Sequence, residues 1–254
     1  MKNKPQLAVL AGLVGVYALL AFITYAFVPL EQITPGFTGM PADLAAIPGW
    51  LLGLANAGIV LVAYGLFGLA GYWFAIRLGL PGIFREAAGW REWLWRPALI
   101  GLVAGVLLVM LDRVFAALGD YPGFPHPTFP LSLIGSATAA IGEEILFRSF
   151  VLGLWATLLN LALRRWGKTG WALWIANAIA ALAFGASHLP AAMILFGAPS
   201  PAELPQAVLG ELFLLNGLLG LAAGERYLKQ GLVAAVGVHF FADIVWHVIW
   251  PLFS

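Results

Sequence analysis

The segment at residues 141–150, IGEEILFRSF, places two carboxylates and one arginine in an otherwise apolar stretch. Glu144 and Arg148 are four residues apart, so on a helix they share one face, with the glutamate on the N-terminal side that favours an ion pair. Glu143 points about 100° away from Glu144, because an α-helix has about 3.6 residues per turn. The spacing therefore predicts that Arg148 neutralises Glu144 and leaves Glu143 free to act as a general base toward water. The alternative is that the three charges only hold helices together, and spacing alone does not decide between the two.

Two of the four histidines share a predicted helix with an aspartate. In GVHFFADIVWHVIW, His239, Asp243 and His247 follow one another at intervals of four residues and form a stripe along one helix face. His239 and Asp243 can converge on one point, as two ligands one helical turn apart do in zinc sites. Together with Glu143 and with His188, which ends AFGASH, they could hold a metal ion or position a water molecule.

His247 and His126 carry weaker expectations than His188 and His239. His247 has no partner that the sequence identifies, and we expect a structural role for it. His126 lies in the proline-rich loop PGFPHPTFP, where we expect an ordinary external loop residue.

The composition predicts an integral membrane protein. Of the 254 residues, 62% are hydrophobic and 10% are charged, against roughly 25% charged in soluble domains. We expect an all-α fold, a polytopic transmembrane helical bundle of about seven spans, within a range of about six to eight, because apolar runs long enough to cross the bilayer recur along the chain. The predicted spans are 7–28, 50–76, 97–118, 133–160, 171–189, 207–224 and 232–251.

Two further features limit the possible chemistry and processing. The chain has no cysteine, which excludes disulfides, thiolate zinc sites and cysteine nucleophiles. The N-terminal stretch starts with basic residues like a signal peptide, but no small-residue cleavage site follows its apolar run, so we expect a retained first helix.

The basic residues predict the orientation of the spans. Eleven of the thirteen Lys and Arg lie on alternate connections, namely Lys2, Lys4, Arg77, Arg85, Arg91, Arg96, Arg164, Arg165, Lys168, Arg226 and Lys229. By the positive-inside rule these connections face the cytoplasm. The opposite connections carry Glu31, Asp43, Asp120 and Glu203. This pattern predicts a cytoplasmic N-terminus and, with seven spans, an external C-terminus.

The depths of the polar residues in straight helices conflict with a shared site. At about 1.5 Å per residue, Glu143 and His188 fall in the outer half of the bilayer, whereas His239 lies about 12 Å from the cytoplasmic end of its span. Their convergence requires tilted, staggered or broken helices, which glycines such as Gly231 would permit.

Three polar motifs lie on three separate apolar spans: EExxxR at Glu143, Glu144 and Arg148, FxxxH at Phe184 and His188, and HxxxN/D at His239 and Asp243. In this order and spacing they resemble the CPBP intramembrane proteases, which include the CAAX prenyl endopeptidases and bacteriocin-processing and immunity (Abi-like) proteins. The resemblance covers residues 131–250. Within the single membrane unit we therefore expect N-terminal transmembrane helices at 1–130 and a catalytic helical core at 131–254. The tryptophans among arginines and glutamates in GIFREAAGWREWLWRP separately predict a cytoplasmic interfacial helix at about 82–96.

The resemblance implies a peptidase that cleaves within or beside the bilayer. Glu143 with His188 would activate the attacking water, and His239 with Asp243 would support the oxyanion or bind a metal. Both mechanisms stay open: Zn²⁺ or another divalent metal held by Glu143, His188, His239 and Asp243, or a glutamate-activated water, with no other cofactor. Asp243 stands where prenyl endopeptidases often carry asparagine, and an ionised aspartate cannot donate to an oxyanion. Asp243 therefore favours a metal ligand, a protonated donor or an orienting partner for His239.

These expectations describe an intramembrane endopeptidase of the bacterial cytoplasmic membrane. Its partners would be membrane lipids and a membrane-bound or lipidated protein or peptide substrate, with no nucleic acid. Two alternatives are a proton-coupled transporter, since intramembrane Glu, His and Asp also build proton relays, and a non-catalytic immunity or scaffold protein. The sequence predicts neither the identity of the substrate, nor its prenylation, nor the oligomeric state.

Overall fold

The computed structural model of the chain describes residues 4–29 and 47–253. Every regular element in these residues is a helix. Seven helical stretches are long and apolar enough to cross a membrane, and they coincide closely with the predicted spans. The expected all-α, multi-pass membrane fold is therefore confirmed. Lys2, Glu31 and Asp43 lie outside the described residues.

The first three spans contain α1 (Lys4–Phe27), then α4 (Gly49–Ile59), the π-helical η1 (Val60–Tyr64) and α5 (Gly65–Arg77), then the π-helical η2 (Arg91–Trp95) and α6 (Arg96–Gly119). The fourth contains α7 (Leu131–Glu143), the π-helical η3 (Glu144–Leu152), α8 (Gly153–Leu163) and the short η4 (Arg164–Trp166). The remaining elements are α9 (Thr169–Ser187), α10 (Leu189–Phe196), η5 (Pro201–Glu203), α11 (Gln206–Gln230), α12 (Leu232–Asp243), the π-helical η6 (Ile244–Ile249) and η7 (Trp250–Leu252).

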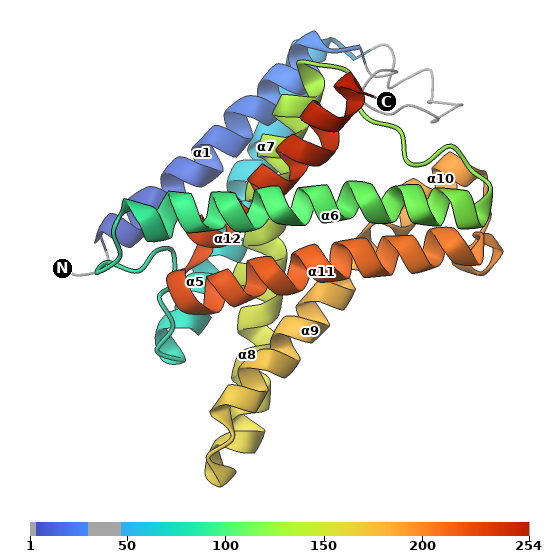
Figure 1. Cartoon of the computed structure of the whole chain (residues 1–254). Coiled ribbons are helices and arrows are strands. Elements are labelled where there is room, and N and C mark those ends of the chain that lie inside the picture. The colour runs from blue at the N-terminus through green and yellow to red at the C-terminus, as the bar shows by residue number, and fades with distance from the viewer. Residues whose placement is uncertain (1–3, 30–46, 254) are drawn as a thin grey trace.

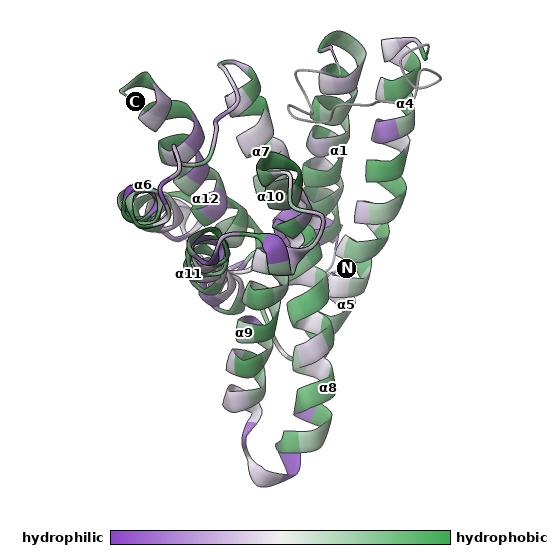
Figure 2. Cartoon of the chain, turned by 90° about the vertical axis from the view of Figure 1, so that its right-hand side faces the viewer, coloured by the Kyte–Doolittle hydropathy of each residue, from purple (hydrophilic) through white to green (hydrophobic). Residues whose placement is uncertain are grey.

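Two sets of helices cross each other steeply. In Figure 1, α6 and α11 run next to each other across the view, whereas α8 and α9 run down it. Figure 2 is turned by 90° and shows α6 and α11 end-on, with α8 and α9 still seen along their length. At the crossing, α11 packs against α9, α6 and α12. The expected departure from straight, parallel helices is confirmed, and it removes the conflict in depth between the polar motifs.

The helix expected at about 82–96 is only partly present, which corrects that prediction. Residues 82–89 form turns, and the helix begins at Trp90 and continues through η2 into α6. The turns are held by other elements, because the carbonyls of Gly82 and Ile83 accept the N–H groups of Leu232 (3.0 Å) and Val233 (2.9 Å) at the start of α12. These bonds satisfy amides that a helix N-terminus otherwise leaves unpaired.

The side chain of Gln6 fastens the same turns to α1. Its Oε1 accepts the N–H groups of Ile83 (2.9 Å) and Phe84 (3.1 Å), and its Nε2 donates to the carbonyl of Phe84 (2.7 Å). The turn at 82–84 therefore lies between the first and the last span and is bonded to both.

Close helix contact in the core depends on glycine, and Gly224 of α11 gives the sharpest prediction. A Cβ atom at Gly224 would lie 1.7 Å from Oδ1 of the fully buried Asn177 of α9. We expect Gly224→Ala to lower the free energy of unfolding by about 1–3 kcal/mol, as overpacking does in other cores. Thermal unfolding of the detergent-solubilised protein measures the change.

Gly217 is the matched control, because it lies on the same helix and a Cβ there meets nothing within 4 Å. Gly217→Ala is expected to be neutral or stabilising by up to about 1 kcal/mol, since alanine loses less backbone entropy in a helix. Equal stability of the two variants would contradict the close α9–α11 packing.

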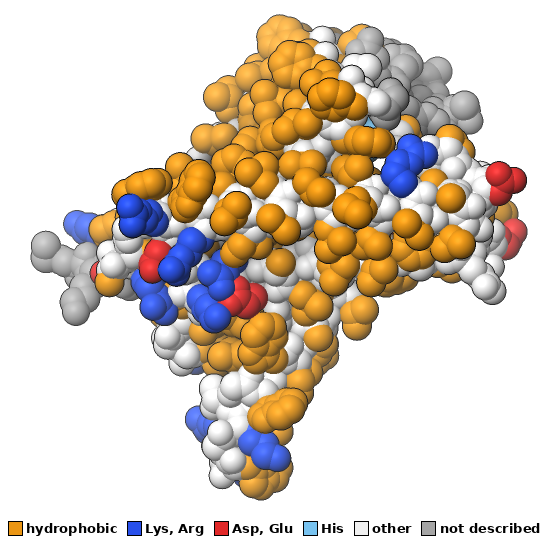
Figure 3. Space-filling model, viewed as in Figure 1, with side chains coloured by type: hydrophobic (Ala, Val, Ile, Leu, Met, Phe, Trp, Pro, Cys, Tyr) orange, Lys and Arg blue, Asp and Glu red, His pale blue; other side chains and the backbone are white. Residues whose placement is uncertain are grey.

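The surface matches a protein that faces lipid. Hydrophobic side chains cover most of the face in Figure 3, and Lys and Arg gather at its left and lower ends, where α5, α11 and α8 end. The core is instead rich in small residues, including Ala176, Ala180, Ala223 and Ala235. Small residues allow helices in a bilayer to approach closely, which takes the place of the hydrophobic drive available in water.

Candidate functional site

The two neighbouring glutamates occupy different environments. Glu144 and Arg148 both have fully buried side chains, and Arg148 Nε lies 3.2 Å from Glu144 Oε2. The other carboxylate oxygen of Glu144 lies 2.9 Å from Nδ1 of His239. The predicted pairing of Glu144 with Arg148 is therefore confirmed, and Glu144 also links the first motif to the third.

Phe184 connects all three motifs through its ring. The guanidinium carbon of Arg148 lies 4.8 Å from the centre of this ring. The imidazoles of His188 and His239 have their centres 5.0 Å and 5.5 Å from it. Phe184 is 1% exposed. Its buried ring is therefore held in place by packing and contacts both imidazoles.

Glu143, the last residue of α7, is the accessible member of the pair of glutamates. Its side chain is 31% exposed, and its Oε2 lies 3.6 Å from Nε2 of His239. The same nitrogen lies 3.6 Å from Oδ2 of Asp243. These distances exceed those of direct hydrogen bonds, so neither carboxylate is bound directly to His239 Nε2.

His188 lies at the junction of α9 and α10, where the helix direction changes. Its Nδ1 lies 2.9 Å from the carbonyl oxygen of Phe184. A carbonyl only accepts, so this contact assigns the proton to Nδ1 and leaves a lone pair on Nε2. His188 can therefore accept a hydrogen bond or bind a cation through Nε2.

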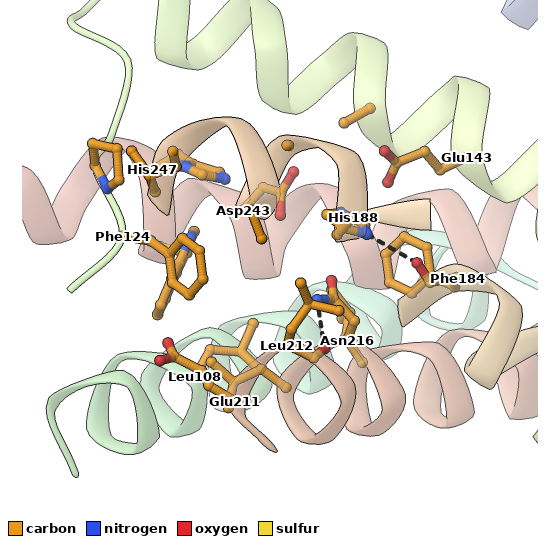
Figure 4. Close-up of a pocket in the computed structure, with 18 of the residues that line it drawn as sticks. Leu108, Phe124, Glu143, Phe184, His188, Glu211, Leu212, Asn216, Asp243 and His247 are labelled. Carbon is orange, nitrogen blue, oxygen red and sulfur yellow. Dashed lines mark hydrogen bonds between the residues drawn. The ribbon is translucent and has the colours of Figure 1, made fainter. Parts of the chain in front are cut away.

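One cavity of about 560 Å³ brings the predicted site residues together. Its wall includes Glu143, His188, His239 and Asp243. Figure 4 shows Glu143, Asp243 and His188 around the same space. Glu144 and Arg148 do not line this cavity; Glu144 contacts the lining residue His239, and Arg148 lies over the ring of the lining residue Phe184. Most other lining residues are apolar, so the wall of the cavity is largely hydrophobic.

The donor chemistry of the site fits a divalent cation, although the side chains are not gathered into a metal site. His188 and His239 both have Nδ1 engaged with an oxygen acceptor. This is how metal-binding histidines are commonly oriented, with Nε2 toward the ion. Within residues 4–29 and 47–253, no group of three or more His, Asp or Glu is placed closely enough to hold a metal. The side chains would have to move closer together to bind one.

The loop after α6 contributes to the cavity, which we did not predict. Phe124 and Pro125 line the wall, and His126 Nδ1 lies 3.1 Å from Nδ1 of His247. His126 is therefore more than an ordinary external loop residue, and His247 has a partner that its sequence context did not reveal. Burial lowers the pKa of His126, which favours a neutral ring and a single shared proton between the two nitrogens.

A further carboxylate in the wall, Glu211 of α11, was also missed. Its side chain is buried at 1% exposure, and its Oε2 accepts a hydrogen bond from the hydroxyl of Tyr121. Burial raises the pKa of Tyr121, so the phenol stays protonated and donates. Glu211 belongs to none of the three motifs; the available signal was a lone acidic residue inside a predicted span.

Comparison with known proteins supports the resemblance seen in the motifs. The family model described as "Type II CAAX prenyl endopeptidase Rce1-like" matches residues 125–245. The matched range contains all three motifs, from Glu143 to Asp243, and the cavity-lining Pro125 of the loop before α7. No curated protein and no solved structure matches the chain.

Proposed function

We propose that the protein is an intramembrane endopeptidase in which Glu143 and His188 activate a water molecule. The match of residues 125–245 to the model of the Rce1-like type II CAAX prenyl endopeptidases supports the peptidase assignment. The contrast between the two glutamates carries this proposal. Glu144 is fully buried between Arg148 and His239, whereas Glu143 is partly exposed in the wall of the cavity. Of these two glutamates, only Glu143 is accessible to a water molecule and to a substrate.

The reaction proposed is hydrolysis of a peptide bond. The water oxygen attacks the carbonyl carbon of the scissile bond while Glu143 takes the proton, and Nε2 of His188 accepts the second hydrogen bond of the water. The electron pair of the carbonyl moves to its oxygen. Collapse of this intermediate breaks the C–N bond, and Glu143 returns its proton to the leaving nitrogen.

His239 and Asp243 are proposed to act on the carbonyl oxygen. Glu144 accepts from Nδ1 of His239 and fixes the plane of the ring. An imidazolium at this position would donate from Nε2 toward the developing oxyanion, as fixed donors do in other acyl-transfer sites. Asp243, whose Oδ2 lies 3.6 Å from the same nitrogen, would orient that ring and balance its charge.

The substrate proposed is a membrane-bound or lipidated peptide or protein. The cavity lies among apolar spans and has a largely apolar wall. Such a site favours segments that are themselves apolar, because water is excluded when they bind. Location in a bacterial cytoplasmic membrane with a cytoplasmic N-terminus remains part of this proposal and depends on the distribution of basic residues.

Comparison of peptide ends in cell membranes tests the function directly. Membranes carrying the wild-type protein are expected to contain new N-termini that are missing from membranes with the Glu143→Gln variant at equal abundance. Identical sets of peptide ends would contradict proteolysis. A cellular immunity phenotype that survives in this variant would instead favour the non-catalytic scaffold.

A divalent metal at the site is a separate proposal, supported by the two Nε2 lone pairs and the nearby carboxylates. A bound ion would polarise the scissile carbonyl or lower the pKa of water. Gently extracted protein is then expected to contain about one divalent ion per chain by elemental analysis, and His188→Ala should lose it. Metal-free protein whose cleavage activity is unaffected by chelators would exclude this mechanism.

A further inference from the structure

The carboxylate of Glu211 lies in the same cavity as Glu143, at the other end of it. Figure 4 shows the two side chains on opposite sides, with Glu211 near Phe124 and Leu108. Glu211 is 1% exposed, and its Oε1 has no hydrogen-bond partner within the described part of the chain. Its other oxygen is held by the Tyr121 hydroxyl. The carboxylate is thus fixed in place with one oxygen left unsatisfied.

Among the described residues Glu211 makes no ion pair with a basic side chain, although Arg113 of α6 is near enough to act on its charge without contacting it. The residues that line the cavity include Glu143, Glu211 and Asp243, but no Lys or Arg. Asp112 of α6, itself 2% exposed, lies beside Glu211 and adds a second acidic group. Burying an unpaired carboxylate is costly, and the cost falls sharply when a cation pairs with it.

We propose that the Glu211 end of the cavity is a subsite for a cationic side chain of the substrate, Lys or Arg, near the scissile bond. This inference rests on the proposed peptidase function and adds a substrate class to it. A long basic side chain has an apolar stem and a charged tip. The stem would lie along Leu108, Leu212 and Phe124, and the tip would donate to Glu211 Oε1.

The loop after α6 prepares this subsite. The ring of Tyr121 packs edge-on against Phe124 and Phe196, with centres 6.4 Å and 5.5 Å away. Asp112 Oδ1 also accepts the N–H of Phe124 at 3.4 Å. These contacts fix the position of the Tyr121 hydroxyl and therefore of the carboxylate that it holds, which lowers the entropy lost when a substrate binds.

The test measures a ratio of activities with purified full-length protein. A proteome-derived peptide library in detergent first identifies sequences that wild type cuts and Glu143→Gln does not; we expect Lys or Arg to be enriched at one position beside the cleaved bond. One such sequence is then synthesised with Lys and with norleucine at that position. The ratio of kcat/KM for Lys over norleucine is expected to fall roughly 10- to 100-fold in Glu211→Gln, the size of a lost hydrogen bond between charged groups.

Two further variants complete the test. Glu203→Gln changes an exposed carboxylate outside the cavity and should leave the ratio unchanged. Tyr121→Phe keeps the ring but removes the hydroxyl that holds Glu211, and should lower the ratio by a smaller factor of roughly 3 to 10. Because both peptides are measured on one preparation, partial unfolding cancels, and Tyr121→Phe provides the answer if Glu211→Gln does not fold.

The possible failures are distinct. If wild type cuts no more of the library than Glu143→Gln, the proposed peptidase function is wrong. If wild type cuts peptides without preference for Lys or Arg, or if the ratio stays the same in both Glu211→Gln and Tyr121→Phe, the peptidase function stands and the cationic subsite is wrong.

Discussion

Glu143→Gln is expected to lower the rate of peptide cleavage about 10²- to 10⁴-fold, the range that a positioned general base contributes. Glutamine has nearly the same shape as glutamate but cannot accept the proton of the attacking water. The melting temperature should change little, because Glu143 is partly exposed and makes no direct hydrogen bond with His239. Cleavage of a quenched fluorescent peptide by purified protein, with thermal unfolding measured in parallel, checks both expectations.

Two comparisons separate a catalytic role for Glu143 from a general effect of lost charge. Glu86→Gln removes an exposed carboxylate that does not line the cavity and should retain wild-type activity. His188→Ala should lose activity as well, and the double variant should lose little more than the worse single variant, because residues acting on one water do not contribute additively. Full activity in Glu143→Gln would overturn the assignment of the base.

Arg148→Met is expected to destabilise the protein by about 3–5 kcal/mol, the typical result of leaving a buried charge without its partner. Arg148 and Glu144 are wholly buried and 3.2 Å apart. Without Arg148, the carboxylate of Glu144 keeps only the contact with His239. The free energy of unfolding in detergent or mixed micelles measures the effect.

The double variant Glu144→Gln/Arg148→Met should recover part of that loss, because it leaves no buried charge from the pair. The exposed pair formed by Arg96 and Glu92, with atoms 3.6 Å apart, provides the matched control. Arg96→Met should cost at most about 1 kcal/mol, as is usual for pairs in solvent or at an interface. Equal losses for Arg148→Met and Arg96→Met would show that the buried pair contributes no special stability.

The sequence predicted the parts of this fold that depend on neighbours along the chain. Seven apolar stretches predicted the spans because crossing a bilayer requires length and hydrophobicity alone. The contact between Glu144 and Arg148 was also predictable from the sequence, because both residues lie on one helical segment at an interval of four. The pattern of Trp and Arg at 82–96 was misleading, because the turns at 82–89 are fixed by Gln6 and by the start of α12.

Features that depend on how helices cross could not be read from one sequence. Packing of α12 against α7 brings His239 near Glu143, and the cavity that they line also takes in His188 at the end of α9, whereas straight, parallel helices would have kept the three residues apart. The contact between His126 and His247 joins a loop to the last span across 121 positions. Glu211 had a signal, a single acid within an apolar span, but its orientation toward the cavity depends on packing and on Tyr121.

The turn at 82–84 has a consequence for the order of biosynthesis. It is bonded on one side to Gln6, which leaves the ribosome among the first residues, and on the other to Leu232 and Val233, among the last. During translation the first helix can therefore cross the membrane long before the turn that binds it forms its hydrogen bonds with Leu232 and Val233. The helix α12, whose first residues bind this turn, also carries His239 and Asp243. A partly synthesised chain thus holds Glu143 and His188 without His239 and Asp243, so the proposed active site is incomplete until the final span is in place.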